Sequence, residues 1–207
     1  MNKQKRVAET IRQVITSIMD KVMVKVLQKD SLIKEEHHSK KPHYAALLPD
    51  EVFKGSHFER RFVTPFETAW DNLATAVAIE GHGECLKNHS ISGNVNTERL
   101  RRIQEVLNRL AHSTKVKEKP DWDAEIKYIL QGTGEPVPVS ITCDIFVRNK
   151  QTGHNYAFEL NDPLPNSDQT KVSKEKMFKL LAMEPQQVTA TFYALPYNPY
   201  GKKEDYA

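Results

Sequence analysis

Two acidic residues, Asp144 and Glu159, stand on two apolar, alternating segments, Val139–Val147 and Tyr156–Asn161. A symmetric hairpin built from these segments places the two acids directly opposite each other, with Cβ atoms roughly 4.5–5.5 Å apart on one face. Two carboxylates this close repel each other unless a cation or a proton joins them, and oxygen-rich pairs suit Mg²⁺. The pattern therefore predicts a site for a divalent cation.

The register of this hairpin depends on its turn. The point midway between the two acids falls between Gln151 and Thr152, which favours the symmetric pairing. If Gly153 were a left-handed bulge residue, the register would shift, and a one-residue slip would turn Glu159 to the other face. In the symmetric register, alternation predicts a polar edge and a core-facing side, the first made of Ala157, Glu159 and Asn161, the second of Tyr156, Phe158 and Leu160.

Composition places the chain among soluble globular proteins, with 39% hydrophobic and 28% charged residues in a length of 207. No apolar run approaches the roughly 18–20 residues that span a bilayer, so we expect no membrane segment. The two cysteines, Cys85 and Cys143, indicate a reducing compartment and a cytoplasmic location rather than a disulfide framework. A net charge of +3 permits a polyanionic partner without requiring one.

The first half of the chain is predicted to be helical. Apolar residues at intervals of three or four predict a long amphipathic helix near residues 3–29, followed by a polar loop from Lys29 to Pro42. Thr64 and Pro65 are typical of a helix start, and Gly81 and Gly83 end that helix. Asn96 or Thr97 caps a further helix.

From Asp121 the period changes. Residues 122–130 could form a strand or a last helix, and we favour the strand. After the hairpin we expect a polar helix from Ser167 to Met183 and a strand from Gln187 to Leu195. This order predicts an α/β (α+β) fold in which a mixed central sheet is flanked by helices. We expect a helical N-terminal region over residues 1–118 and a core over 119–207, joined in one continuous structural domain.

Several blocks of sequence, in this order, resemble the catalytic half of a PD-(D/E)XK nuclease: Cys143–Phe146, Tyr156–Asn161, Pro163–Lys171 and Lys174–Lys176. With Glu59–Phe66 and Tyr193–Gly201, the likeness is to type II restriction endonucleases of the TdeIII type and covers nearly the whole chain. The resemblance implies a restriction-endonuclease-like fold and Mg²⁺-dependent cleavage of double-stranded DNA at a short palindrome, GG-any-CC. It also implies a homodimer and a restriction-modification system, in which a cognate DNA methyltransferase is a functional rather than a physical partner.

The resemblance assigns catalytic roles to Asp144, Glu159 and Asn161. Mg²⁺ would be held by the two acids and the Leu160 backbone carbonyl, and Asp71 and Glu59 could reach it through water. The family has a lysine where this chain has Asn161, whose amide can orient water but carries no charge. Lys171 or Lys174 could supply a substitute cation. Asn161 could equally be a residue of the turn that ends the strand.

Other polar residues around the expected site could contact DNA. Phosphate contacts are expected from basic side chains, for all of which a solvated surface is the alternative: Arg60, Arg61, Lys171, Lys174 and Lys176. Base contacts are expected from the polar loop of Asn166, Ser167, Asp168 and Gln169, for which helix capping is the alternative.

Two departures from the family keep a second hypothesis open. The chain carries Asn161, and it stops at Ala207, where we expect the family to continue, so it resembles a shortened member. A degenerate member that binds DNA without cutting is therefore the alternative, and a repair or junction nuclease on the same core is a third. His82, Cys85 and His89 could bind zinc, but structural zinc sites use four ligands.

Overall fold

A computed structural model describes residues 2–24, 69–111 and 120–201 of the chain. The chain divides into two compact units, Met1–Gly81 and His82–Ala207. No helix in the described ranges combines the length and the apolar character that crossing a membrane requires.

The first unit contains α1 (Lys3–Met23) and a helix over residues 69–82, whose last residue, His82, belongs to the second unit. The Asn2 side chain caps α1 by accepting a hydrogen bond from the Gln4 backbone. Lys3 Nζ donates to the Gly81 carbonyl over 2.8 Å, which joins the start of α1 to the end of the second helix. The expected N-terminal helix is confirmed from residue 3 to 23. The predicted Lys29–Pro42 loop and the helix start at Thr64 lie outside the described residues.

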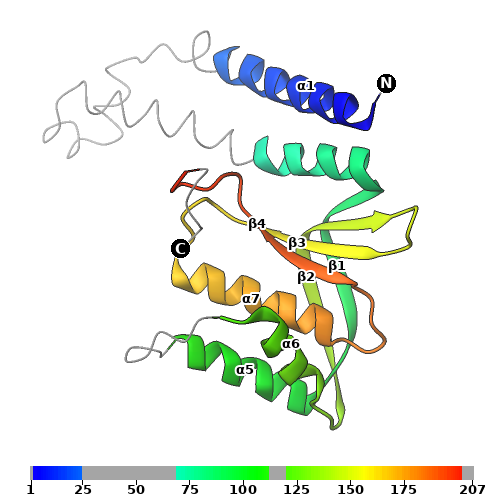
Figure 1. The fold of residues 1–207 in the computed structure, drawn as a ribbon, viewed down its shortest axis with the longest axis vertical. Coiled ribbons are helices and arrows are strands. Elements are labelled where there is room, and N and C mark those ends of the chain that lie inside the picture. Colours follow the sequence, from blue (N-terminus) through cyan, green and yellow to red (C-terminus); the bar gives the residue numbers. More distant parts are fainter. Residues whose placement is uncertain (1, 25–68, 112–119, 202–207) are drawn as a thin grey trace, which may run out of the picture. The chain divides into compact units, whose positions relative to one another are not determined.

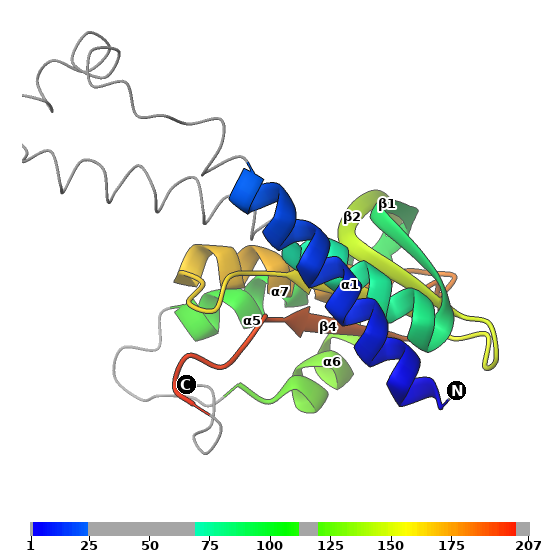
Figure 2. The same cartoon turned by 90° about the horizontal axis from the view of Figure 1, so that it is seen from above.

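The second unit contains a four-stranded mixed sheet in the order β1-β2-β3-β4. Its strands are β1 (Gly83–Asn96), β2 (Pro136–Asn149), β3 (Asn155–Leu160) and β4 (Ala190–Ala194). β1 and β2 form a long antiparallel ribbon and lie side by side in both views (Figures 1 and 2). β3 pairs antiparallel with β2 and parallel with β4. The expected mixed sheet is confirmed, and β1 is an additional strand that was not predicted.

Three helices gather on one side of this sheet: α5 (Thr97–Ala111), α6 (Trp122–Leu130) and α7 (Ser167–Ala182) (Figure 1). α7 connects β3 to β4, as the crossover between two parallel strands requires. The core between helices and sheet includes Ile103 of α5, Ile129 of α6 and Phe178 of α7, all fully buried. The predictions of α5 and α7 are confirmed. β1 and α5 fall within residues 1–118, the range expected for the helical N-terminal region. They nevertheless lie in the same compact unit as β2, β3 and β4.

The prediction of a strand over residues 122–130 is wrong, because this segment is α6. The Asp121 side chain caps the helix by accepting a hydrogen bond from the Ala124 backbone over 3.0 Å. Trp122, Ile126 and Ile129 recur at helical spacing and pack on the core. The Trp122 ring stacks on that of Phe178 with centroids 4.9 Å apart, so α6 packs directly against α7.

Candidate active site

The hairpin that carries the acid pair has the symmetric register. Ile145 pairs with Phe158, and Asp144 and Glu159 are the next residues along their two strands. The Asn149 N–H donates to the His154 carbonyl over 2.9 Å and closes a four-residue loop. Gly153 in this loop has a φ of 73° but adds no bulge to the ladder. The expected hairpin and its register are therefore confirmed.

The alternation of side chains along β2 changes phase at Asp144. Cys143 and Phe146 both belong to the core cluster, although residues three apart on a regular strand point to opposite faces. On β1, the residue that faces Asp144 is Asn88, which has a φ of 48° and is absent from an otherwise continuous ladder. The ribbon is thus irregular on both strands at the level of Asp144, as strands often are beside functional sites.

The carboxylate of Asp144 points toward β3. Its Oδ2 accepts a hydrogen bond from the Leu160 backbone N–H over 2.7 Å. In a continued ladder this N–H would bond to the backbone of β2, but the ladder between these strands ends at Ile145 and Phe158. Asp144 therefore replaces a backbone acceptor and holds its carboxylate beside the end of β3.

Glu159 lies on the buried face of β3 and is only 3% exposed. Lys176 of α7 donates a hydrogen bond to Glu159 Oε2 over 2.7 Å. Glu159 Oε1 is buried and has no hydrogen-bond partner among the described residues. Burial raises the pKa of Glu159, the hydrogen bond from Lys176 lowers it, and the negative charge of Asp144 raises it further. The two carboxylates are therefore close enough to repel each other.

The expected faces of β3 are the reverse of those observed. Ala157 and Glu159 are on the buried side, whereas the alternating residues are only half-buried. Phe158 instead stacks on Phe192 of β4, with ring centroids 5.0 Å apart. The physical reason is that α7 covers the Glu159 side of the sheet and brings Lys176 as a partner, so the acid can be buried.

Asn161 follows the acid on β3 and also contacts α7. Its Nδ2 donates to the Oγ of Ser173 over 3.2 Å, and Ser173 is buried. Ser173 and Lys176 are three residues apart on α7, so they share one helix face. This face contacts Glu159 of β3 and Asn161, which directly follows the end of β3. The sequence interpretation did not anticipate Ser173, and it considered Lys176 as a phosphate contact or part of a solvated helix face rather than as a partner of Glu159.

Lys171 and Lys174, expected as substitute cations, contact other groups. Lys171 Nζ lies 3.4 Å from Asn108 Oδ1, and Lys174 Nζ forms an ion pair of 2.6 Å with Glu125, a buried acid of α6. The lysine that contacts the acid pair is Lys176.

The polar loop before α7 forms the cap of that helix. Asn166 accepts a hydrogen bond from the Gln169 N–H, and the Gln169 side chain accepts one from the Asn166 N–H, which makes a capping box. Ser167 and Asp168 occupy the first turn. The capping alternative is thus observed for two of the four residues.

The remaining candidate residues lie in the first compact unit or outside the described residues. Asp71 lies in the helix over residues 69–82, in the first compact unit. Glu59, Arg60 and Arg61 lie outside the described residues. Within the described part of the chain, no group of three or more His, Cys, Asp or Glu side chains could hold a metal ion. The site therefore offers two carboxylates, to which backbone carbonyls can add further oxygens.

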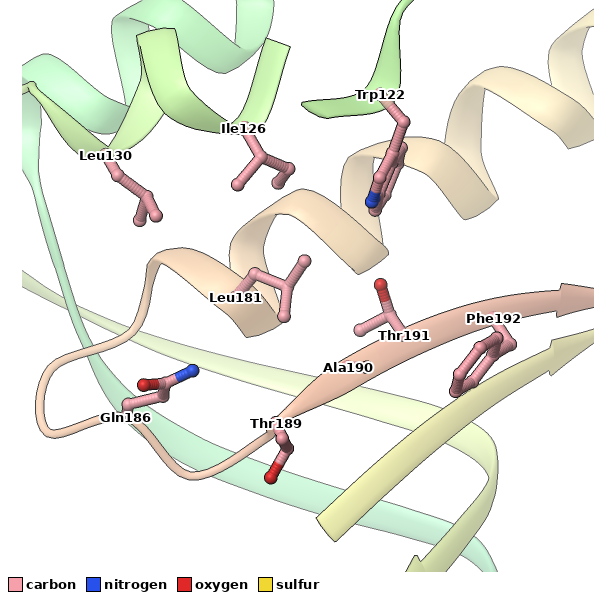
Figure 3. A pocket seen from close by; sticks show the side chains of 9 residues that line it. All are labelled: Trp122, Ile126, Leu130, Leu181, Gln186, Thr189, Ala190, Thr191 and Phe192. Atoms are coloured by element: carbon pink, nitrogen blue, oxygen red, sulfur yellow. The ribbon is translucent and has the colours of Figure 1, made fainter. Parts of the chain in front are cut away.

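A separate pocket of about 330 Å³ opens between α6, the end of α7 and β4 (Figure 3). Its lining is mostly apolar, with Trp122, Ile126 and Leu181 on the helical side. Neither Asp144 nor Glu159 lines it. This pocket is therefore distinct from the acid pair.

Comparison with known proteins yields one family and several relatives. The family model described as "Type II restriction endonuclease, HinfI" matches residues 7–207. The type II restriction enzymes HgiEI and HgiBI of Herpetosiphon aurantiacus are 22% and 21% identical to the chain over 165 residues. The type II restriction enzyme HgiCII of the same organism is 21% identical. Each match covers 78% of this chain and 60% of the relative's length. No solved structure matches significantly.

Proposed function

Because the chain belongs to the HinfI family of type II restriction endonucleases, we propose that it hydrolyses phosphodiester bonds in double-stranded DNA at a specific site, with Mg²⁺ as cofactor. The observation that carries this proposal is the buried Glu159 carboxylate beside Asp144, one oxygen of which has no partner in the described part of the chain. A buried acceptor without a partner is costly, and a bound cation would remove that cost.

The donor set at this position fits Mg²⁺. Asp144, Glu159 and the Leu160 carbonyl would hold it, because carboxylate and carbonyl oxygens are the ligands that hard divalent cations prefer. The Asn161 N–H donates to the Ala194 carbonyl over 3.1 Å, which fixes the peptide group that includes the Leu160 carbonyl. When bound, Mg²⁺ activates water and offsets the charge of a non-bridging phosphate oxygen. Asn161 stands beside this position and can orient a water molecule through its amide.

Substrate contacts follow from the same proposal. Lys171, Arg60 and Arg61 would contact phosphates, which adds affinity without sequence information. Lys174 was expected among them, but its ammonium forms an ion pair with the buried Glu125 of α6, so we assign it a structural role. Asn166, Ser167, Asp168 and Gln169 would approach base edges, and any base contact by Asn166 or Gln169 would have to compete with the capping box. Glu59 and Asp71 would act on the cation through water.

Finer features of the function stay predictions. These are the TdeIII type, the GG-any-CC target, the homodimer, the cytoplasmic location and the cognate methyltransferase. A two-fold dimer suits a palindromic target, because each protomer then meets the same half-site. The chain spans 60% of the length of the curated relatives it matches, so we propose these features for the activity of the whole protein.

Digestion of a supercoiled plasmid of known sequence tests the proposal. With Mg²⁺ we expect discrete fragments whose ends map to one short sequence, and none with EDTA. Glu159→Ala should abolish the fragments. Glu125→Ala is the matched control, because it also removes a buried acid that pairs with a lysine of α7 and lies outside the site. A smear, or fragments that persist in Glu159→Ala, would contradict the proposal.

The second candidate is a family member that binds DNA without cutting it. The contact of Asn161 with Ser173 favours this reading, because the residue at the position of the family's lysine is uncharged and bonded to a helix. This candidate predicts that the wild-type protein shifts duplex DNA in a gel and leaves the plasmid intact. Asn161→Lys would then restore cleavage if this residue alone were responsible.

A further inference from the structure

We propose that Lys176 is the catalytic cation of the site: its ammonium neutralises Glu159 in the free protein and contacts the scissile phosphate when DNA and Mg²⁺ are bound. This inference rests on the proposed nuclease function. It assigns the role to a residue of α7, whereas Lys171 and Lys174 contact other groups.

The position of Lys176 suits both contacts. Its Nζ lies 2.7 Å from Glu159 Oε2, and its side chain is 33% exposed, whereas that of Glu159 is 3% exposed. The lysine therefore reaches from solvent to a buried acid. A flexible four-carbon side chain with three donor hydrogens can contact a carboxylate and a phosphate oxygen together.

A charge count shows why the site needs this cation. Asp144 and Glu159 together carry two negative charges, which a divalent cation only balances. The phosphodiester adds one negative charge, and further negative charge develops on its oxygens during hydrolysis. Preorganised positive groups aimed at such charge give large rate effects. Lys176 is the basic side chain in contact with the acid pair within the described ranges, and neighbouring Asn161 is neutral.

The chain contains a matched control two residues away on the same helix. Lys174 pairs with Glu125 over 2.6 Å, and Glu125 is also 3% exposed. Both pairs join a lysine of α7 to a buried glutamate, but Glu125 lies on α6 rather than in the hairpin. Loss of Lys174 thus measures the structural effect of breaking such a pair.

Three variants test the role: Lys176→Met, Lys176→Arg and Lys174→Met. The first readout is the single-turnover rate of cleavage of a duplex that contains the mapped target. We expect Lys176→Met to lower this rate by roughly 10²–10³-fold, the typical effect of removing one charge-stabilising group. Lys176→Arg should keep more activity because it keeps the charge, and Lys174→Met should stay within about threefold of wild type. If Lys176→Met does not fold, Lys176→Gln replaces it, with the same expected loss.

The second readout does not depend on cleavage. In the free protein the Lys176 ammonium competes with a divalent cation for Glu159, so its removal should increase the rise in Tm that Mg²⁺ produces. The rise in Lys174→Met should equal that of wild type. If the rise in Tm that Mg²⁺ produces is the same in Lys176→Met as in wild type, the ammonium does not compete with the cation for Glu159, and that result overturns the proposal.

The cleavage results separate two failures. If wild type cleaves and Lys176→Met cleaves within threefold of it, the role of Lys176 is wrong and the nuclease function stands. Equal rate losses in Lys176→Met and Lys174→Met also overturn the role of Lys176. A wild-type protein that leaves every plasmid intact overturns the nuclease function and, with it, this inference.

Discussion

Asp144 Oδ2 lies 2.7 Å from the Leu160 backbone nitrogen, at the level where the β2–β3 ladder ends. One acid of the proposed site therefore completes the hydrogen bonding of the hairpin that presents the other. Because an acid in this position contributes to folding as well as to chemistry, a loss of activity in an Asp144 variant is informative only beside a measurement of stability.

Two substitutions of Asp144 separate these contributions. Asp144→Ala leaves the half-buried Leu160 N–H without its acceptor and should cost about 1–3 kcal/mol of unfolding free energy. Asp144→Asn keeps an amide oxygen as acceptor in the same place and should cost less than about 1 kcal/mol. Both should abolish Mg²⁺-dependent cleavage. Urea unfolding and plasmid digestion measure the two effects, and equal stability losses would show that the hydrogen bond contributes little.

From the raised pKa of Glu159 we can predict how the free energy of unfolding depends on pH. Burial raises its pKa above the value of about 4.3 in an unfolded chain, against the opposing effect of Lys176. An acid of this kind stabilises the fold below the unfolded pKa, and that stability is lost as pH rises through the folded pKa. Glu159→Gln, which does not titrate, should therefore become more stable relative to wild type between pH 4 and pH 8. Thermal unfolding in EDTA measures this, and a constant difference across pH would contradict it.

A double variant tests whether the position of the cation can move. Asn161→Lys places an ammonium two residues beyond Glu159, directly after the end of β3. In a Lys176→Met background, it should raise the single-turnover cleavage rate at least about tenfold, because one added donor near the developing charge has effects of this order or larger. The same change in a Lys174→Met background is the control and should give no comparable gain. A double variant as slow as Lys176→Met would show that position 161 cannot replace 176.

The two cysteines should differ in reactivity. Cys143 is fully buried, and burial together with the charge of Glu159 raises its pKa to about 11, whereas Cys85 is only half-buried. Because the thiolate is the reactive form, iodoacetamide at pH 8 should modify Cys85 and leave Cys143 largely intact. Labelling of Cys143 should increase toward pH 11 and in Glu159→Gln. Mass spectrometry of native and urea-unfolded protein measures both sites, and equal native labelling would contradict the prediction.

The hairpin and its register could be predicted because the information is local. Two apolar segments and a turn of fixed length determine which residues face each other, and Asp144 and Glu159 occupy the expected positions. α5 and α7 were predictable from their caps and spacing. The type II restriction endonuclease class, inferred from blocks of sequence, is confirmed.

Features that depend on distant contacts could not be predicted in this way. β1 is rich in Gly, Asn and Ser, and it becomes a strand by pairing with β2, about fifty residues further along the chain. α6 is short and apolar, so its pattern also fits a strand until the Asp121 cap is considered. The buried side of β3 carries Glu159 because Lys176, seventeen residues later, lies over it. Alternation alone assigns an acid to the polar face and cannot anticipate such a partner.

The change of phase in β2 has a consequence for redesign of this scaffold. Positions 137 to 143 send their odd-numbered side chains toward the helices, whereas Phe146 fills the same core from an even-numbered position. A designer who rewrote the strand with one uninterrupted binary pattern would remove either Cys143 or Phe146 from this core. Any graft of this hairpin onto another protein must therefore carry the irregular step at Asn88 and Asp144 with it.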